Sequence, residues 1–179
     1  MRISIRKFEQ CDIERKIRWI NDPRNNRFLH YDLPLQYHKT LQWYQANKDN
    51  DRRYDGVILA DDVPVGLIGL LGIDSKNLKA EYYIALGEAA YKGKGVAKQA
   101  SGQLLEYAFQ VLKLNKVCLY TEKDNLAAQR LFERIGFQKE GLLREDLIYN
   151  NRKVDRLVYG ITAEDFFNTH TSAENTVKR

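Results

Sequence analysis

The chain has 179 residues, 44% of them hydrophobic and 30% charged, and a formal net charge of +5. This composition predicts one globular domain, 1–163, with a buried core and a polar tail, 164–179. Two cysteines make no disulfide framework, three scattered histidines make no metal site, and no apolar run is long enough for a membrane span. We therefore expect a cytoplasmic protein without a metal or a membrane partner. The dispersed positive charge gives no support for nucleic-acid binding.

The first half of the chain predicts an alternating order of strands and helices. A strand is expected over 2–8, followed by a helix that Asp12 caps and that ends at Asn21-Asp22-Pro23. A second helix is expected around 40–46. Three strands follow, with a turn at Asp61-Asp62, and they suggest an antiparallel meander over about 53–60, 63–73 and 79–86.

The second half continues this order. A helix from about 95 to Leu112 is expected to bury one face, made by Ala97, Ala100, Leu104, Ala108 and Val111. A short strand, 116–121, precedes a helix that Asn125 or Asp124 caps and Gly136 stops. Two last strands, about 137–149 and 153–161, flank Asn150-Asn151, which tolerates positive φ and predicts a hairpin. The tail beyond Ala163 has one apolar patch, Phe166-Phe167, and is expected to be partly disordered.

A basic turn with the sequence YKGKGVA, residues 91–97, lies between a predicted strand and a predicted helix. Gly93 and Gly95 let backbone N–H groups point at a ligand, and the helix start adds unpaired amides and the positive end of its dipole. Lys92, Lys94 and Lys98 add charge. The turn predicts a pyrophosphate site, with an ordinary glycine turn as the alternative. A Walker A loop and a G-x-G-x-x-G fingerprint are both excluded, because Gly95 and Lys98 stand where those motifs need other residues.

Two motifs in register resemble those of the GNAT superfamily of acyl-CoA N-acyltransferases. The pattern Arg/Gln-x-x-Gly-x-Gly/Ala falls on Lys92, Gly95 and Ala97, with Lys in the leading position. The pattern Asn-x-x-Ala-x-x-x-Tyr-x-x-x-Gly-Phe falls on a second set, with Phe in place of Tyr: Asn125, Ala128, Phe132, Gly136 and Phe137. The order of elements matches over all but the tail. The segments WINDP and EGLLRED resemble most the acetyltransferases of spermidine and diamines, of ribosomal-protein N-termini and of nucleotide-linked amino sugars.

The resemblance implies a fold, a cofactor and the residues that bind it. The fold is α/β (α+β): a mixed, mostly antiparallel twisted sheet of about seven strands, with helices on both faces and two splayed parallel central strands. The cofactor is acetyl-CoA, with its pyrophosphate on the glycine turn and its pantetheine arm between 81–86 and 116–121. Strand-end amides would polarise the thioester carbonyl. The implied cofactor-binding residues are Ile84, Ala85, Leu86, Lys92, Gly93, Lys94, Gly95, Val96, Ala97, Asn125 and Phe132.

The resemblance also implies an amine acceptor and a base. A primary amine is protonated at pH 7, and presenting its neutral form costs about 4–5 kcal/mol. Glu81 opens the strand before the turn and is expected to remove the proton through water, the alternative being a solvated strand-end glutamate. Phe132 has no proton for the departing thiolate, so Tyr120 or Tyr149 donates instead or the thiolate leaves unaided. Direct attack in a ternary complex is favoured over a cysteine intermediate.

The resemblance further implies an acceptor pocket made by the region from the first to the second helix and by the last hairpin. The residues it points to are Trp19, Asn21, Arg24, His30, Tyr31 and Asp32, with Tyr149 of the hairpin as an additional candidate. Their mixed charge leaves the acceptor open among a small amine, a polyamine and an amino sugar, with a protein N-terminus as a further alternative. A non-catalytic CoA-binding regulatory module and a nucleotide-phosphate switch are the other classes, and a homodimer stays open. The sequence thus predicts an acetyl-CoA-dependent N-acetyltransferase.

Overall fold

The computed structural model describes the chain from residue 1 to residue 176, with side chains through Thr169. Its strands form a seven-stranded sheet of order β1-β2-β3-β4-β5-β7-β6, in which β4 and β5 are parallel and the other adjacent pairs are antiparallel. The predicted mixed sheet is therefore confirmed. The backbone divides into two compact units: Met1–Ile73 with Tyr82–Leu104, and Asp74–Glu81 with the chain from Leu105 onward.

The first unit follows the predicted element order. Its strands are β1 (Ile3–Lys7), β2 (Tyr54–Ala60), β3 (Val63–Asp74) and most of β4 (Lys79–Leu86), and its helices are α1 (Ile13–Asn21), α2 (Pro23–Asn26), α3 (Tyr37–Asn47) and α4 (Val96–Glu106). The β2–β3 turn falls on Asp61-Asp62, whose φ angles of 47° and 67° are both positive. The meander is confirmed, and the four-residue helix α2 is an addition that the sequence did not predict.

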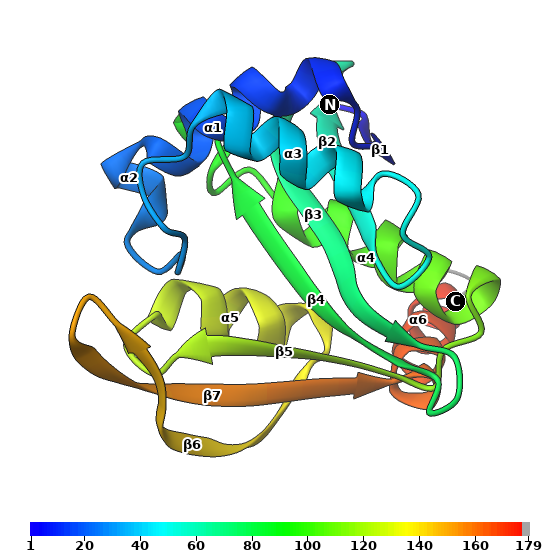
Figure 1. Ribbon diagram of the computed structural model, residues 1–179. Helices are drawn as coiled ribbons and strands as arrows, with labels where there is room; N and C mark the ends of the chain where they lie inside the picture. The colour runs from blue at the N-terminus through cyan, green and yellow to red at the C-terminus, as the bar shows by residue number, and fades with distance from the viewer. Residues whose placement is uncertain (177–179) are drawn as a thin grey trace. The chain divides into compact units, whose positions relative to one another are not determined.

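The core of the first unit lies between the strands and helices α1 and α3. Val57 and Leu67 are direct partners in the β2–β3 ladder and pack with Ile13 and Ile20 of α1. Figure 1 shows α1 and α3 side by side over these strands and α4 on their opposite side. The Gln103 side chain of α4 donates a 2.8 Å hydrogen bond to the Ile3 carbonyl. Both faces of these strands are thus covered by helices.

Two helix details differ from the sequence prediction. The Asp12 carboxylate does not cap α1, because Asp12 ends a 3-10 turn, Gln10–Asp12, where it accepts from the Glu9 N–H at 3.0 Å and from Arg6 at 2.6 Å. Val111 is 63% exposed instead of buried. The chain after α4 forms a π-helical turn, Tyr107–Val111, and its wider hydrogen-bond spacing moves position 111 off the apolar face that a regular helix would have.

The second unit contains the rest of the sheet and two more helices. Its elements after the start of β4 are β5 (Lys116–Glu122), α5 (Leu126–Ile135), β6 (Gln138–Tyr149), β7 (Arg152–Thr162) and α6 (Ala163–Thr176). The Asn125 side chain accepts from the Ala128 N–H at 3.2 Å, and Gly136 ends α5 at a φ of 112°. The β6–β7 hairpin turns at Asn150-Asn151, both with positive φ. The predicted cap, stop and hairpin are all confirmed.

The segment expected to be a partly disordered tail starts as helix α6. Thr162 and Asp165 cap it reciprocally: the Thr162 N–H donates to Oδ2 of Asp165 at 3.0 Å, and the Asp165 N–H donates to Oγ1 of Thr162 at 3.1 Å. The Phe166 ring is 4% exposed and lies 5.4 Å from that of Phe109. The structure describes this segment as helix as far as Thr176, and residues 177–179 lie outside the described part. The division at residue 163 and the partial disorder of the tail stay predictions. No helix in residues 1–176 is both long and apolar enough to span a membrane.

Candidate functional site

The glycine turn of the first unit presents main-chain amides. Gly93 and Gly95 have φ angles of 75° and 80°, a left-handed conformation that favours glycine. The first helical hydrogen bond of α4 runs from the Gln99 N–H to the Gly95 carbonyl at 3.1 Å. The N–H groups of residues 96–98 therefore have no carbonyl partner within the helix. A Cβ built on Gly93 would meet nothing within 4 Å, so an anion has room to approach this backbone.

Two lysines of the turn have defined contacts. Lys92 donates from Nζ to Oδ1 of Asn25 at 2.7 Å. The Lys94 ammonium lies 5.8 Å from the centroid of the Tyr91 ring. Both lysines are exposed, so their charges are available to a ligand at the turn.

The end of β4, residues 84–86, has a backbone fixed by its neighbour β3. The N–H groups of Gly87 and Glu88 both donate to the Val65 carbonyl, at 2.9 and 3.2 Å. Gly66 allows this close approach, because a Cβ there would lie 2.7 Å from the Ala85 carbonyl oxygen. Ile84, Ala85 and Leu86 are each half-buried. The strand end that the sequence predicted to bind the cofactor arm therefore has a fixed backbone and remains partly exposed.

The Trp19 ring of α1 packs against the residue that follows this strand end. The ring is 3% exposed and packs on Gly87, where a Cβ would lie 2.1 Å from the indole. Its Nε1 donates to the Glu88 carboxylate at 2.8 Å. Trp19 was expected to contact the acceptor, but this burial leaves its side chain little surface for a substrate.

Four more of the residues expected to contact the acceptor lie on or just after α2: Arg24, His30, Tyr31 and Asp32. Arg24 is exposed and bonded to the Asp22 carboxylate, with 2.7 Å between Nη2 and Oδ2. His30 and Tyr31 are half-buried, Asp32 is exposed, and burial raises the pKa of the Tyr31 phenol. The Asn21 side chain joins the two ends of this segment: it donates to the Leu35 carbonyl at 3.0 Å and accepts from the Leu35 N–H at 2.7 Å.

Side chains of the second unit gather on one face of its strands. The ladder places Cys118 opposite Gly160, Tyr120 opposite Val158 and Glu122 opposite Arg156. Glu81 joins them from β4, where it pairs with Cys118. Burial raises the pKa of the Glu81 carboxyl, and the positive charge of Arg156 opposes that shift. A raised pKa brings the Glu81 carboxyl closer to the range in which a carboxylate accepts a proton effectively, and its role as the base stays a prediction.

Arg156 organises this face. It donates from Nε to Oδ2 of Asp146 at 2.6 Å, and its guanidinium lies 4.8 Å from the centroid of the Tyr120 ring. Burial and then the charges of Cys118 and Glu81 raise the pKa of Tyr120, so its phenol keeps its proton at neutral pH. Burial and the Glu81 charge also raise the pKa of the Cys118 thiol, which disfavours the thiolate that covalent catalysis would need.

Phe132 and Asn125 have clear structural roles in the second unit. The Phe132 ring is 7% exposed and lies 6.1 Å from the ring of Phe137 and 6.2 Å from that of Tyr159. Asn125 caps α5. The cofactor contacts expected of both residues stay predictions.

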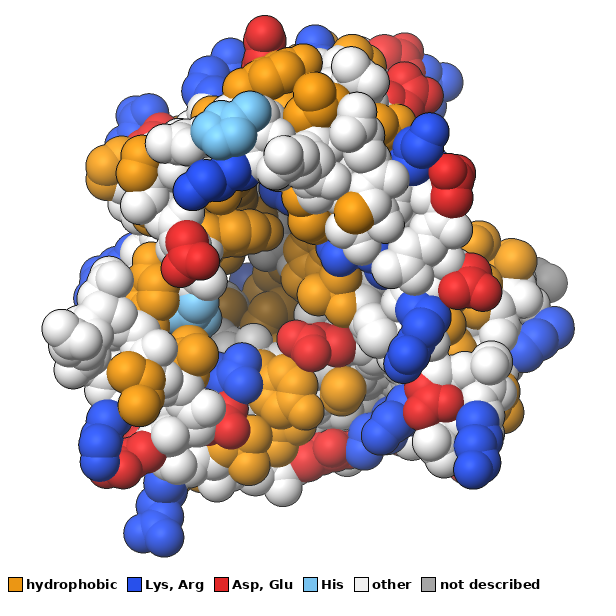
Figure 2. Space-filling model, in the orientation of Figure 1, with side chains coloured by type: hydrophobic (Ala, Val, Ile, Leu, Met, Phe, Trp, Pro, Cys, Tyr) orange, Lys and Arg blue, Asp and Glu red, His pale blue; other side chains and the backbone are white. Residues whose placement is uncertain are grey.

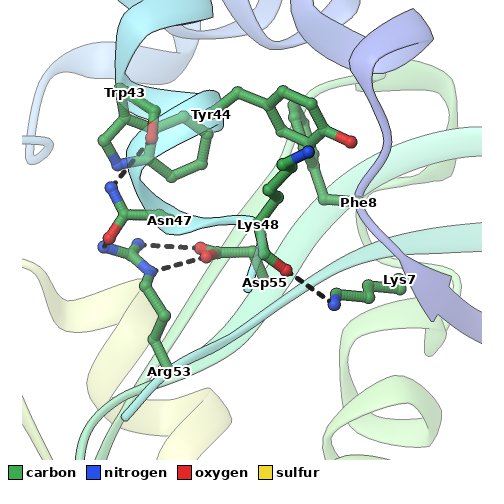
Figure 3. Close-up of a pocket in the computed structure, with 8 residues that line it drawn as sticks. All are labelled: Lys7, Phe8, Trp43, Tyr44, Asn47, Lys48, Arg53 and Asp55. Atoms are coloured by element: carbon green, nitrogen blue, oxygen red, sulfur yellow. Dashed lines mark hydrogen bonds and ion pairs between the residues drawn. The ribbon is translucent and has the colours of Figure 1, made fainter. Parts of the chain in front are cut away.

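A small cavity of about 20 Å³ lies elsewhere in the first unit (Figure 3). Arg53 binds the Asp55 carboxylate from Nε at 2.6 Å, and the Tyr83 hydroxyl donates to the same carboxylate at 2.7 Å. A space of this size holds about one water molecule and is too small for an amine substrate. The residues that line it are Lys7, Phe8, Trp43, Tyr44, Asn47, Lys48, Arg53 and Asp55.

Four residues of these arrangements were not found by sequence reasoning: Asn25, Glu88, Asp146 and Arg156. Asn25 contacts Gly87, 62 positions away, and Trp19 contacts Glu88, 69 positions away, so no local spacing could reveal them. Asp146 and Arg156 lie on one hairpin, but an irregular register between Leu143 and Leu147 breaks the simple count from the turn. Figure 2 shows basic and acidic side chains interspersed on the face in view.

Comparison with known proteins covers both sequence motifs and most of the chain. Residues 2–138 match the family model described as an acetyltransferase (GNAT) domain. The putative ribosomal N-acetyltransferase YdaF of Bacillus subtilis is 32% identical over 174 residues, covering 92% of this chain and 93% of that protein. The spermidine N(1)-acetyltransferase of Vibrio cholerae is 30% identical over 155 residues, covering 86% of this chain and 88% of that protein.

A solved structure shares the fold. The crystal structure of spermidine N-acetyltransferase from Vibrio cholerae, in complex with CoA and spermine, has a TM-score of 0.85 to this chain, with 24% identity. The match covers 92% of this chain and 98% of that one. At this identity the likeness establishes the arrangement of strands and helices.

Proposed function

Since this chain belongs to the GNAT acetyltransferase family and is an N-acetyltransferase, we propose that it transfers the acetyl group of acetyl-CoA to a primary amine of a polyamine. The left-handed glycine turn at the start of α4 carries this proposal, because its main-chain amides suit the diphosphate of the coenzyme. The 30% identity to a spermidine N(1)-acetyltransferase supports the polyamine as acceptor.

The residues of the first unit fit the coenzyme. Gly93 and Gly95 leave the backbone open, the N–H groups of residues 96–98 lack helical partners, and Lys92 adds a positive charge. The half-buried end of β4, residues 84–86, would bind the pantetheine arm. When bound, acetyl-CoA supplies a thioester whose carbonyl accepts the amine. Asn125 and Phe132 are proposed as further contacts, on the motif alone.

Glu81 is proposed as the base. Its half-buried position raises the pKa of its carboxyl, which brings it closer to the range in which a carboxylate accepts a proton effectively. The neutral amine form costs about 4–5 kcal/mol for an ordinary alkylamine at pH 7, and a positioned carboxylate removes that proton through water. The positive charge of Arg156 opposes this rise in the Glu81 pKa.

The CoA thiolate needs less assistance from a proton donor than the amine needs from a base. A thiol with an ordinary pKa of about 8.5 is a tolerable leaving group, so Phe132 need not be a tyrosine. Tyr120 is the candidate donor on the same face as Glu81, because its phenol keeps its proton at neutral pH. Arg24, His30, Tyr31 and Asp32 are proposed for the acceptor, while Trp19 supports the strand end. The homodimer and the cytoplasmic location stay predictions.

A second acceptor class is favoured by a specific observation. The relative of 32% identity is named a putative ribosomal N-acetyltransferase, so a protein N-terminus is the competing substrate. A CoA-release assay separates the two with a panel of spermidine, spermine, an amino-sugar nucleotide and peptides with ribosomal-protein N-termini. We expect turnover with the polyamines. Turnover with the peptides alone would favour the second class, and CoA binding without turnover on any acceptor would indicate a non-catalytic module.

A further inference from the structure

Asn25, which no motif identifies, ties three parts of the first unit together. Its Nδ2 donates to the Trp19 carbonyl at 3.2 Å and to the Gly87 carbonyl at 3.0 Å. Its Oδ1 accepts from Nζ of Lys92 at 2.7 Å. One amide thus joins α1, the residue after β4 and Lys92 of the glycine turn.

The residues around Asn25 are themselves held by hydrogen bonds and by packing. The Asp22 carboxylate caps α2 by accepting from the Arg24 N–H at 2.9 Å, and the Asn25 N–H bonds to the Asp22 carbonyl at 2.9 Å. The Trp19 ring packs on Gly87 and is locked by its hydrogen bond to Glu88. Since carbonyls only accept and an ammonium only donates, the orientation with Nδ2 toward the two carbonyls and Oδ1 toward Lys92 satisfies all three partners of the Asn25 amide.

The partner that Asn25 offers to Lys92 is neutral. Among the described residues, Lys92 forms no ion pair with a carboxylate and bonds to Asn25 instead. The nearby Asp22 carboxylate is occupied by Arg24, whose hydrogen bonds, with a smaller contribution from the Lys92 charge, lower the Asp22 pKa to about 2. A neutral acceptor fixes the ammonium without cancelling its charge.

We propose that Asn25 is a positioning residue for coenzyme binding, which holds the Lys92 ammonium in place at the glycine turn with its charge available to the diphosphate. This role rests on the proposed function, because Lys92 lies in the turn assigned to acetyl-CoA. A free lysine side chain loses rotamer freedom when it binds an anion, and Asn25 removes much of that loss beforehand.

A double-mutant cycle on CoA binding tests the proposal. Calorimetric titration with CoA compares the wild type with Asn25→Ala, Lys92→Met and the double variant. We expect Asn25→Ala to weaken binding about 3- to 10-fold and Lys92→Met about 10-fold. The double variant should bind no more weakly than Lys92→Met, because Asn25 acts through Lys92. Independent, multiplying effects would overturn the positioning role, since a merely structural residue would weaken binding in both backgrounds.

Two further variants extend this test. Asn25→Asp examines the importance of a neutral acceptor for Lys92, and Asn26→Ala is a control for changes in the folding of α2. Asn25→Asp keeps the size and the acceptor oxygen but adds a charge that pairs with Lys92, so CoA should bind at least as weakly as to Asn25→Ala. Wild-type affinity for Asn25→Asp would overturn the role of the neutral acceptor. Asn26→Ala, the next residue of the same helix, should bind CoA as the wild type does.

A second ligand identifies the phosphate that Lys92 meets. Dephospho-CoA keeps the diphosphate and lacks the 3′-phosphate, so the loss caused by Asn25→Ala should persist with it. A loss seen only with CoA would overturn the assignment to the diphosphate. A wild type that binds neither ligand would overturn the proposed function itself, whereas tight wild-type binding with a multiplicative cycle overturns the role of Asn25 alone.

Discussion

The two units present different kinds of surface. The first offers main-chain amides at a turn whose shape depends on the positive φ of Gly93 and Gly95. The second offers side chains on a strand face, where Glu81, Tyr120 and Arg156 influence one another's protonation and position. Main-chain amides suit the binding of an anion such as the diphosphate of the coenzyme, whereas titratable side chains suit proton transfer. Changes in the turn should therefore alter cofactor affinity, and changes on the face should alter rate and pH dependence.

The largest expected effect is on the second unit. Glu81→Gln keeps the shape of the side chain and removes the base, so turnover should fall about 100-fold at neutral pH while CoA affinity stays within about twofold. Steady-state rates with the best acceptor of the panel, together with a CoA titration, measure both quantities. Undiminished turnover would remove Glu81 from the reaction.

The second-largest expected effect is a rise in the KM for acetyl-CoA after a change in the glycine turn of the first unit. Gly95→Val places a β-branched residue at a φ of 80°, a strain of about 1–2 kcal/mol that the turn relieves by changing shape. The KM for acetyl-CoA should rise about tenfold, with a much smaller change in kcat. Gly102→Ala is the matched control, because its Cβ would meet nothing within 4 Å inside the same helix. An unchanged KM for Gly95→Val would take the turn out of the site.

A smaller effect should appear in the pH profile. The base works as a carboxylate, so activity should rise with pH through the pKa of Glu81, which burial places above its ordinary value. Asp146→Asn removes the carboxylate that partly neutralises Arg156. Arg156 would then stabilise ionised Glu81 more strongly, and the acidic limb of kcat/KM should move down by about half a pH unit.

The control for this shift is Glu164→Gln, an exposed change on α6 of the same unit. It should leave the profile where it is. An acidic limb that moves upward in Asp146→Asn, or stays fixed, contradicts the link from Asp146 through Arg156 to Glu81.

The smallest expected effect is that of Phe132→Tyr. The ring lies in a buried aromatic cluster, so the added hydroxyl has to find a partner there and should lower the stability by about 1–3 kcal/mol. Turnover should change less than about threefold, because a thiolate leaves without direct proton donation. A tenfold gain in kcat would show instead that a proton donor is missing from the natural chain.

The sequence predicted the parts of the molecule that depend on local pattern. Gly93 and Gly95, the Asn125 cap, the Gly136 stop and the Asn150-Asn151 hairpin all depend on backbone conformations that particular residue types favour. Each could be recognised within a few positions, and so could the turn that carries the cofactor proposal.

The parts that the sequence did not reveal depend on distant contacts or on a change of period. Asn25 meets Gly87 and Lys92 only because α1 and α2 pack at the end of β4. Val111 is exposed because a π-helical turn shifts the phase of the helix. Trp19 has the residue type of a substrate contact, and only its 3% exposure shows that it supports the strand end.

The most direct test is a calorimetric titration of the wild type and Gly95→Val with acetyl-CoA in the absence of an acceptor. The account predicts saturable binding to the wild type and about tenfold weaker binding to the variant, with both proteins folded. A wild type that gives no saturable heat, or a variant that binds with unaltered affinity, would contradict a main-chain diphosphate site at residues 93–98.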